Sequence, residues 1–367
     1  MAKQTRTLNV AMIGYGFMGR AHSNAIHQVG CFFDVPYELK QKVVCGRNRE
    51  AVESFAAQWG WDETQTDWKS VVTRKDIDLV DICSPNHMHA PIAIAAAEAG
   101  KIVLCEKPLA LNVAEAKRMA DAARKLPNLV WFNYRRVPAV ALAKQLVDQG
   151  KIGKPYHYRA TYLQSWGGDP ANAGKWRFRK SDAGSGAMGD LLSHSLDLAL
   201  LLNGPITELA SMVQTFVPGR EVDDAVLTLA RFANGSIGSF EATRFAIGCQ
   251  NRNYFEIHGS HGSIRFNLED MNRLGVFDAG DATEIKGSHD VLVTGPGHPY
   301  VGQFWPPGHI IGYEHTFIAT LADFLDCMTK NKAFHPNFDD AVEVQKLLEA
   351  VENADQSKGW TSVAAPK

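Results

Sequence analysis

Short apolar runs alternate with amphipathic segments along the first 134 residues of the chain. The apolar runs have the length of buried strands and lie over 8–13, 42–45, 79–83, 102–105 and 129–132. Helical spacing follows the first run and recurs over 50–58, 91–98 and 113–124. Because short loops join strand to helix to strand, the pattern predicts a doubly wound parallel sheet with helices on both faces.

The pattern changes after this segment. A predicted helix over 139–148 is followed by long strand-like runs over 156–164, 209–217, 225–232, 236–244, 254–258 and 263–267. Segments of hairpin length at 233–235 and 259–262 join two pairs of these runs. We therefore predict an α/β domain over 1–134 and an α+β domain over 135–367 with a large, mostly antiparallel sheet.

The second domain has too few helices to cover both faces of such a sheet. One face is therefore expected to pack against another subunit, which predicts a homodimer or a homotetramer. Two final helices, predicted over 313–328 and 339–353, are expected to pack back on the first domain.

Three glycines follow the first predicted strand in the spacing Gly14-x-Gly16-x-x-Gly19. In a strand–turn–helix context, Gly14 permits the tight turn, Gly16 lets a pyrophosphate approach the backbone, and Gly19 lets helix and strand pack closely. The helix N-terminus then offers its free N–H groups to the phosphates. The first domain is therefore predicted to be a Rossmann dinucleotide-binding fold.

The end of the second strand should contact the ribose of the nucleotide. Asp34 lies twenty residues after Gly14, but it falls in a proline-containing loop before that strand, so we reject it. Arg47 and Asn48 stand at the strand end instead of a carboxylate. Arg47 could pair with a 2′-phosphate, and Asn48 could bond a bare 2′-hydroxyl, so these residues leave NAD and NADP open.

Two further segments follow strands at the same predicted sheet edge. Ligands of such sheets bind outside the carboxyl ends of the strands. The segment 84–89 (SPNHMH) is therefore placed to contact the nicotinamide ribose, although a turn with surface histidines is the alternative. Glu106-Lys107-Pro108 ends the next strand, and Lys107 could hold a substrate hydroxyl and stabilise an alkoxide. Pro108 biases Lys107 towards an extended conformation.

A glycine-rich entry at 183–189 leads into a predicted helix over 190–202. Asp190, His194 and Asp197 have the spacing i, i+4 and i+7, so they share one helix face. A carboxylate beside an imidazole fixes its tautomer and raises its basicity, which suits His194 to take a proton from a hydroxyl. No third ligand is evident for a metal, and we predict none.

Several stretches of mixed aromatic and polar residues could line a pocket for a polyhydroxylated ligand. They lie at 134–136, 164–166, 175–177 and 309–315. The candidate substrate-binding residues are Lys107, Tyr134, Arg136, Gln164, Trp176, Asp190, His194 and Tyr313.

Composition and charge narrow the function classes. A net charge of -2 argues against a nucleic-acid or anionic-membrane partner, since both favour a concentrated basic surface. No apolar run reaches the roughly 20 residues of a transmembrane helix, and no signal core is present. The six cysteines contain no C-x-x-C pair, and Cys45, Cys83 and Cys105 are interpreted as buried strand residues in a reducing compartment, which predicts a cytoplasmic protein.

Five motifs together resemble the Gfo/Idh/MocA family of oxidoreductases. They are GYGFMG at 14–19, SPNHMH at 84–89, EKP at 106–108, NYRR at 133–136 and GDLLSHSLD at 189–197. The segments 243–245 and 305–317 look most similar to levoglucosan-type and inositol-type sugar dehydrogenases of that family.

The resemblance implies a Rossmann domain, an open-faced sheet domain, and Lys107, Asp190 and His194 as the catalytic set. Relatives that act in catabolism tend to use NAD, which favours NAD here. The candidate cofactor-binding residues are Gly14, Gly16, Phe17, Met18, Gly19, Arg47, Asn48, Ser84, Pro85, Asn86, His89, Glu106 and Lys107.

Three functions fit these residues. The leading one is oxidation of a secondary hydroxyl of a sugar, anhydrosugar or cyclitol to a ketone. The second is a glycosidase or lyase that cycles tightly held NAD through a transient keto-sugar. The third, from another class, is a non-catalytic protein that binds NAD as a signal. Reductases of imine-type or biliverdin-type substrates complete the range.

Overall fold

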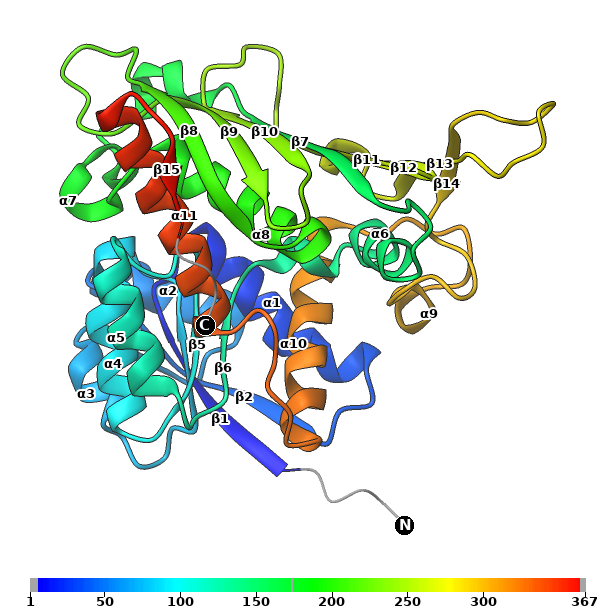
Figure 1. The fold of residues 1–367 in the computed structure, drawn as a ribbon. Coiled ribbons are helices and arrows are strands. Elements are labelled where there is room, and N and C mark those ends of the chain that lie inside the picture. Colours follow the sequence, from blue (N-terminus) through cyan, green and yellow to red (C-terminus); the bar gives the residue numbers. More distant parts are fainter. Residues whose placement is uncertain (1–5, 173, 364–367) are drawn as a thin grey trace. The chain divides into compact units, whose positions relative to one another are not determined.

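A computed structural model describes residues 6–172 and 174–363 (Figure 1). It divides into two compact units. The first comprises Met1–Asn133 and Gly312–Val342, and the second comprises Tyr134–Ile311 and Glu343–Lys367. The segment 312–342 therefore belongs to the same unit as the N-terminal residues. Among the described residues, no helix combines the length and the apolar character needed to cross a membrane.

The first unit is built on a six-stranded sheet in the order β3-β2-β1-β4-β5-β6, with every pair parallel. Its strands are β1 Arg6–Ile13, β2 Tyr37–Cys45, β3 Glu63–Gln65, β4 Leu79–Ile82, β5 Ile102–Cys105 and β6 Asn128–Val130. Its helices are α1 Phe17–Phe32, α2 Arg49–Trp59, α3 Trp68–Val72, α4 His89–Glu98, α5 Val113–Ala123 and α10 Tyr313–Thr329.

Helices pack on both faces of this sheet. α3, α4 and α5 form one layer, and α1 and α10 pack against each other on the opposite face (Figure 1). The carboxyl-terminal halves of β1 and β2 and most of β4, β5 and β6 are apolar and buried, as the continuous runs of the sequence predicted. The predicted Rossmann sheet is confirmed. β3 was missed because its residues are polar and it lies at the sheet edge.

The second unit contains a nine-stranded sheet in the order β14-β13-β12-β11-β7-β10-β9-β8-β15. Its strands are β7 Pro155–Leu163, β8 Ile206–Gln214, β9 Ala225–Phe232, β10 Ile237–Thr243, β11 Arg252–Gly259, β12 Gly262–Asn267, β13 Arg273–Asp278, β14 His289–Leu292 and β15 Thr361–Ser362. Only β7 and β10 pair in parallel, so the predicted mostly antiparallel sheet is confirmed.

The remaining helices are α6 Pro138–Asp148, α7 Lys180–Ala183, α8 Ser193–Asn203, α9 Val301–Phe304 and α11 Phe338–Ser357, which begins in the first unit. The short 3₁₀ segments are η1 Asn86–Met88, η2 Asn133–Arg136, η3 Trp166–Gly168, η4 Pro170–Asn172, η5 Trp176–Phe178 and η7 Leu268–Asp270, and η6 Met188–Leu192 is a π turn. Helices α6 and α8 contact the large sheet.

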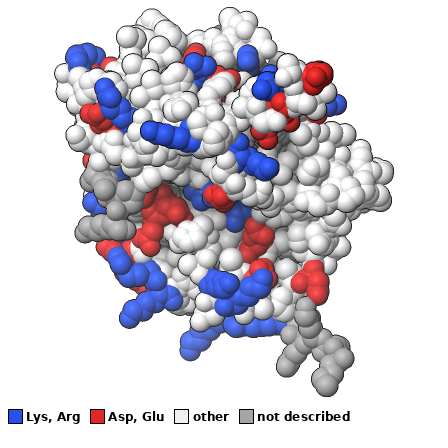
Figure 2. Space-filling view, turned by 45° about the vertical axis from the view of Figure 1, so that its right-hand side comes forward, with Lys and Arg blue, Asp and Glu red and all other residues white. Residues whose placement is uncertain are grey.

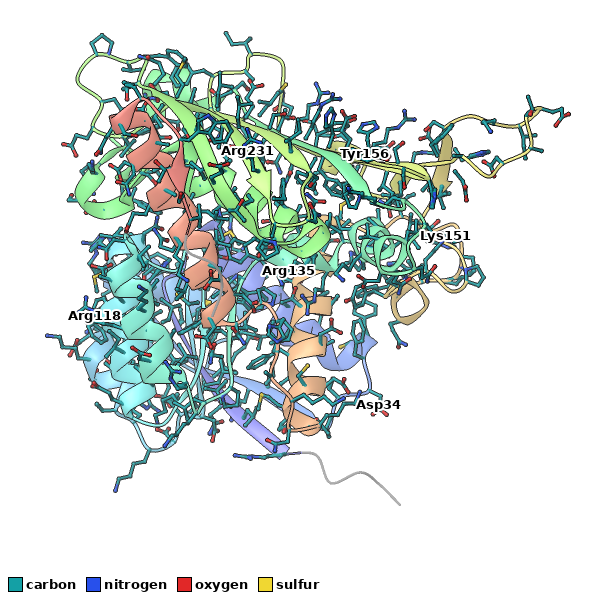
Figure 3. The ribbon with its side chains drawn as sticks, in the orientation of Figure 1. Asp34, Arg118, Arg135, Lys151, Tyr156 and Arg231 are labelled. Atoms are coloured by element: carbon teal, nitrogen blue, oxygen red, sulfur yellow. The ribbon has the colours of Figure 1, made fainter. Side chains whose placement is uncertain are left out.

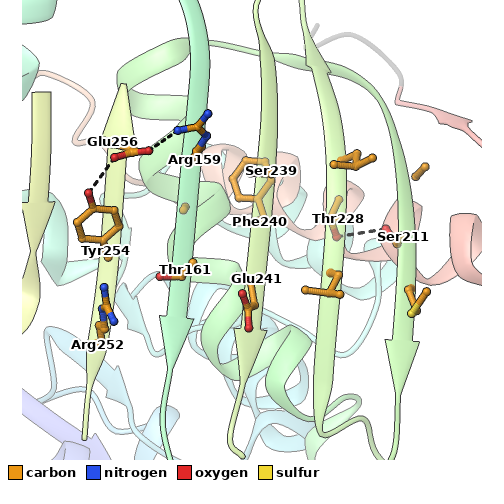
Figure 4. A pocket seen from close by; sticks show the side chains of 15 residues that line it. Arg159, Thr161, Ser211, Thr228, Ser239, Phe240, Glu241, Arg252, Tyr254 and Glu256 are labelled. Atoms are coloured by element: carbon orange, nitrogen blue, oxygen red, sulfur yellow. Dashed lines mark hydrogen bonds and ion pairs between the residues drawn. The ribbon is translucent and has the colours of Figure 1, made fainter. Parts of the chain in front are cut away.

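Side chains of β9 alternate strictly between buried and exposed positions. Val226, Thr228 and Ala230 are buried, whereas Leu227 and Leu229 are 50% and 56% exposed. One face of the sheet therefore carries apolar side chains that this chain leaves exposed. Figure 4 shows that face, with side chains from five neighbouring strands.

Candidate active site

The glycine loop between β1 and α1 has the geometry that a pyrophosphate needs. Gly14 has φ +107°, and a Cβ there would lie 2.5 Å from the carbonyl oxygen of Cys83. A Cβ on Gly19 would lie 2.9 Å from the carbonyl oxygen of Gly14, whereas a Cβ on Gly16 would meet no atom within 4 Å. The turn therefore requires a glycine at position 14, and the close packing of the loop requires one at position 19. Gly16 leaves open space in front of the N-terminus of α1.

Gly46, which follows β2 directly, is also required by packing. A Cβ on Gly46 would lie 1.9 Å from the ring of Tyr15, so the Tyr15 ring covers this position. Arg47 and Asn48 follow and are exposed. The Asn48 side-chain oxygen accepts a hydrogen bond from the amide of Ala51 at 3.0 Å and caps α2. Asp34 lies in the loop between α1 and β2, as expected (Figure 3).

Phe17, at the start of α1, is 57% exposed and stacks on Tyr313 of α10, with ring centroids 6.1 Å apart. Tyr313 in turn lies edge-on to Phe317, with the two rings 5.1 Å apart. Met18, the residue after Phe17, is half-buried. Tyr313 was predicted to bind substrate, and the structure places it next to the glycine loop. Its contact with the sugar stays a prediction.

The segment 84–89 follows β4 at the carboxyl edge of the sheet. Ser84 and Pro85 are half-buried, and Asn86 is buried in η1. His89 is fully buried, and its ring nitrogens lie 3.0 Å from the carbonyl oxygens of Pro108 and Ser84. Burial lowers the pKa of His89. In this conformation His89 ties the loop to the Lys107-Pro108 turn, and its side chain has no surface to offer a cofactor.

Glu106 and Lys107 continue directly from β5. A Glu106 carboxylate oxygen accepts a hydrogen bond from the Lys107 amide at 3.0 Å, and Lys107 is half-buried. Glu106 itself is only 5% exposed, and its other oxygen lies 3.0 Å from Nε2 of His22. The backbone of the candidate catalytic lysine is therefore anchored by a buried carboxylate.

The candidate catalytic helix of the second unit begins with an irregular turn. The sequence predicted one regular helix over 190–202, whereas the structure has the π turn η6 before α8. Asp223 accepts hydrogen bonds from the amides of Gly186 and Met188 at 2.6 and 2.7 Å. A Cβ on Gly186 would lie 1.8 Å from the carbonyl oxygen of Asp223. Burial raises the pKa of Asp223. This clamp fixes the start of η6.

Asp190 and Asp197 each form an ion pair with an arginine. Arg244 Nη2 lies 2.8 Å from Asp190, and the Arg244 side chain is 1% exposed. Arg135 contacts both carboxylate oxygens of Asp197, with Nη2 and Nε at 2.6 and 2.9 Å. Bidentate geometry of this kind gives strong, directional pairs. The carboxylates are thus held by partners that lie far away in sequence, and their predicted action on His194 stays untested.

His194 lies among tyrosines. It is 5% exposed, and its ring centroid is 4.5 Å from that of Tyr134 and 5.9 Å from that of Tyr162. The hydroxyls of Tyr134 and Tyr162 are 2.9 Å apart. A hydrogen-bonded row continues from there: Asn251 accepts from Tyr162 and from Gln164 at 2.8 and 2.7 Å. The unit therefore places hydroxyl and amide groups beside its candidate base.

Two other predicted residues lie elsewhere in this unit. Arg136 is half-buried in η2, and Trp176 is half-buried in η5, with the Arg177 guanidinium 4.6 Å from its ring. Sequence reasoning missed Tyr162, Asn251, Arg244 and Asp223. Only Asp223 left a local signal, because it belongs to a pair of adjacent aspartates just before an apolar strand.

Two protein-family models together match most of this chain. Residues 8–134 match the model described as an oxidoreductase family with an NAD-binding Rossmann fold, and residues 140–265 match the GFO/IDH/MocA C-terminal domain. The chain belongs to the Gfo/Idh/MocA family of oxidoreductases. The resemblance drawn from the motifs is therefore confirmed.

Named relatives of this family extend over the whole chain. The chain is 41% identical to levoglucosan dehydrogenase of Pseudarthrobacter phenanthrenivorans over 98% of both proteins. A solved structure of levoglucosan dehydrogenase in complex with NADH and levoglucosan is 43% identical, has a TM-score of 0.95 and covers 98% of this chain and all of that one. An oxidoreductase domain protein from Kribbella flavida is 46% identical, with a TM-score of 0.96 and the same coverage.

NAD is the cofactor of this oxidoreductase, because the matched Rossmann model is an NAD-binding one. The residues present fit it. The open space at Gly16 and the uncovered first turn of α1 suit a pyrophosphate. Arg47 and Asn48 are exposed at the end of β2, where the ribose of a dinucleotide is expected. The match therefore supports NAD, the cofactor that the sequence analysis favoured.

Proposed function

We propose that this NAD-dependent oxidoreductase oxidises a secondary hydroxyl of an anhydrosugar of the levoglucosan type to a ketone, and acts on related sugars or cyclitols. The observation that carries the proposal is the 41% identity with a levoglucosan dehydrogenase along 98% of both chains. The chain also contains Lys107, Asp190 and His194, the residues to which we assign the reaction.

Each catalytic residue has one task in this proposal. His194 takes the proton of the substrate hydroxyl, and the Lys107 ammonium stabilises the alkoxide that develops. NAD, when bound, supplies the nicotinamide carbon that accepts the hydride. Asp190 is held by Arg244 and orients the substrate and His194 by accepting hydrogen bonds.

The substrate is expected to be an unphosphorylated polyol or sugar. The row Tyr134, Tyr162, Asn251 and Gln164 offers hydroxyl and amide groups, and Trp166 Nε1 donates to Gln164 at 2.5 Å. Hydroxyls and amides both donate and accept, so they match the hydroxyl groups of a sugar. An aromatic surface beside them suits the apolar face of a sugar ring. Tyr134, Gln164 and the half-buried Arg136 and Trp176 remain our candidate substrate contacts.

The first test is NADH formation at 340 nm with levoglucosan, free sugars, cyclitols and glycosides, each with NAD and with NADP. We expect one NADH per substrate consumed, a product two mass units lighter, and preference for levoglucosan-type substrates with NAD. Product without net NADH would instead indicate a redox-cycling glycosidase. If the protein binds NAD but converts none of these compounds, it would be a non-catalytic protein. The relatives compared above favour neither alternative.

We further propose that the exposed face of the large sheet joins two copies of this chain. Met212, Leu227 and Leu229 are 63%, 50% and 56% exposed on β8 and β9. A polar cluster flanks them: Glu256 lies 2.7 Å from Arg159 and accepts a hydrogen bond from the Tyr254 hydroxyl at 2.9 Å (Figure 4). An apolar centre with a polar margin is typical of protein interfaces.

Leu229→Glu is expected to convert the oligomer into a 40.3 kDa monomer, because a carboxylate would be buried without a partner at the centre of the interface. Light scattering coupled to gel filtration measures the mass. Ile285→Glu is the matched control, since Ile285 is 62% exposed and lies outside this face. A wild-type mass of one chain would contradict the proposal.

We place the enzyme in the cytoplasm. None of the six cysteines, which all lie within the described residues, forms a disulfide, as expected in a reducing compartment. Lysines, arginines and acidic residues are interspersed on the face shown in Figure 2, which offers no concentrated basic surface to nucleic acid.

A further inference from the structure

His22, on the inner face of α1, makes an unusual set of contacts for a fully buried side chain. Its Nδ1 lies 2.8 Å from Asp81 Oδ2, and its Nε2 lies 3.0 Å from Glu106 Oε1. The ring packs on Trp131 and Phe317, with centroids 4.2 and 5.4 Å away. None of the motifs that identify the family accounts for this residue.

The hydrogen bonds define the protonation of the ring. Both ring nitrogens face carboxylate oxygens, so both must carry a proton when the carboxylates are ionised. Each carboxylate also accepts a second hydrogen bond: Asp81 Oδ1 from Trp131 Nε1 at 2.9 Å, and Glu106 Oε2 from the Lys107 amide at 3.0 Å. The two carboxylates, which can only accept hydrogen bonds when they are ionised, are therefore surrounded by four nitrogen atoms that can donate. The geometry corresponds to an imidazolium between two carboxylates.

The surroundings of the ring agree with a charged form. Burial opposes the charge, but the Asp81 carboxylate and the hydrogen bond to the Cys83 sulfur raise the pKa of His22 well above its ordinary value. The titratable groups that face the ring are Asp81 and Cys83 at β4 and Glu106 at the end of β5. α10 contributes the apolar ring of Phe317. Burial raises the pKa of Cys83 to about 12, so this thiol stays neutral.

We infer that His22 is a positioning residue of the reaction: as an imidazolium it keeps Glu106 ionised, and Glu106 fixes the backbone of Lys107. The inference rests on the role proposed for Lys107. Without a cation at this position, two buried carboxylates would share one pocket, and one of them would take up a proton. If that carboxylate is Glu106, the anchor of the Lys107 amide is weakened.

His22, Asp81 and Cys83 also form the one trio of described residues whose ligand atoms are close enough to suggest a metal. The distances argue for hydrogen bonds. Nδ1 lies 2.8 Å from the Asp81 oxygen and 3.0 Å from the Cys83 sulfur. Tetrahedral ligands of a zinc ion would be separated by roughly 3.3 Å or more. Activity that a chelator abolishes and zinc restores would overturn the ion-pair assignment.

The first measurement uses the wild-type protein and requires no variant. Long-range ¹⁵N spectra of histidine-labelled protein should show one of the thirteen imidazoles doubly protonated well above the ordinary titration range of histidine, and His22→Gln should remove this signal. A set of rings that are all singly protonated at about pH 8 would overturn the inference. This result does not depend on finding the substrate, so it is distinguishable from a failure of the proposed function.

The second measurement compares His22→Gln, Asp81→Asn and the double variant under conditions in which the wild type turns over. His22→Gln should lower kcat about tenfold or more at pH 7, with recovery towards wild type as the pH is raised and the added proton leaves. Asp81→Asn should stay within about threefold, because the new side-chain amide can still accept from Trp131 and donate to a neutral His22. The double variant should regain most of the activity lost in His22→Gln.

Recovery of activity when Asp81→Asn is added to His22→Gln would show that the charge of the pocket matters, rather than the packing of the imidazole ring. The double variant restores the charge but not the shape of the imidazole, so a purely structural His22 would give no rescue and would overturn the inference. His27→Gln, an exposed histidine on the same helix, is the matched control and should retain wild-type activity. Unchanged kcat and pH profile in a folded His22→Gln would equally overturn it.

Discussion

Replacing His194 with Asn lowers kcat about 100- to 10,000-fold while NADH binds with nearly wild-type affinity, if His194 is the general base. The substitution keeps a polar group of similar size in the contact with Tyr134 but removes a base that can take a proton. Steady-state rates measure kcat, and quenching of protein fluorescence by NADH measures binding. Lys107→Met should cause a loss of similar order, because the alkoxide loses its positive partner.

Matched controls make the catalytic losses specific. His289→Asn removes an exposed histidine on β14, and Lys125→Met removes an exposed lysine after α5. Both should retain wild-type rates. Near-wild-type kcat in both His194→Asn and Lys107→Met would contradict the catalytic assignment, even if the protein proved to be a dehydrogenase.

Asp223→Ala is the second change with a large expected effect. It leaves the buried amides of Gly186 and Met188 without acceptors, at about 1–3 kcal/mol for each group. The free energy of unfolding should therefore fall by about 2–6 kcal/mol, and kcat should fall because η6 no longer holds Asp190 and His194 in place. Urea denaturation followed by circular dichroism measures the first quantity.

Asp223→Asn distinguishes the clamp from simple packing at the same position. Asparagine has nearly the same shape, but its NH₂ group would face one of the two backbone amides, so only one hydrogen bond can survive. We expect an intermediate loss. Glu221→Ala, an exposed position two residues earlier, is the control. Wild-type stability in both Asp223 variants would show that the amides find other acceptors.

The parts that could be predicted from the sequence are those whose physical cause is local. Gly14, Gly16 and Gly19 lie within six residues, and their roles follow from one turn. Glu106 and Lys107 follow a buried strand, and parallel topology puts every strand end at one edge. The second sheet was predicted as mostly antiparallel from its hairpins, although β13 and β14 were missed because glycine, charged and polar residues interrupt their apolar patterns.

The parts that were missed depend on partners far apart in the chain. Tyr162 and Asn251 are separated by 89 residues, and Asp190 and Arg244 by 54. In neither pair does the sequence around one residue predict its contact with the other. The same limit explains Tyr313, whose aromatic and polar neighbours in sequence suggested a sugar contact, while its place on α10 brings it to Phe17.

The return of residues 312–342 to the first unit has a consequence for how the enzyme is made. α10 supplies Phe317, which packs on His22 and Trp131, and Thr316, which accepts a hydrogen bond from Asn133 at 2.8 Å. A ribosome delivers these residues only after the whole second sheet except its short edge strand β15 has been synthesised. The nucleotide-binding half must therefore wait, with one side of α1 uncovered, until synthesis is nearly finished. A minimal version of that half would have to join 1–133 to 312–342 rather than stop at the first boundary.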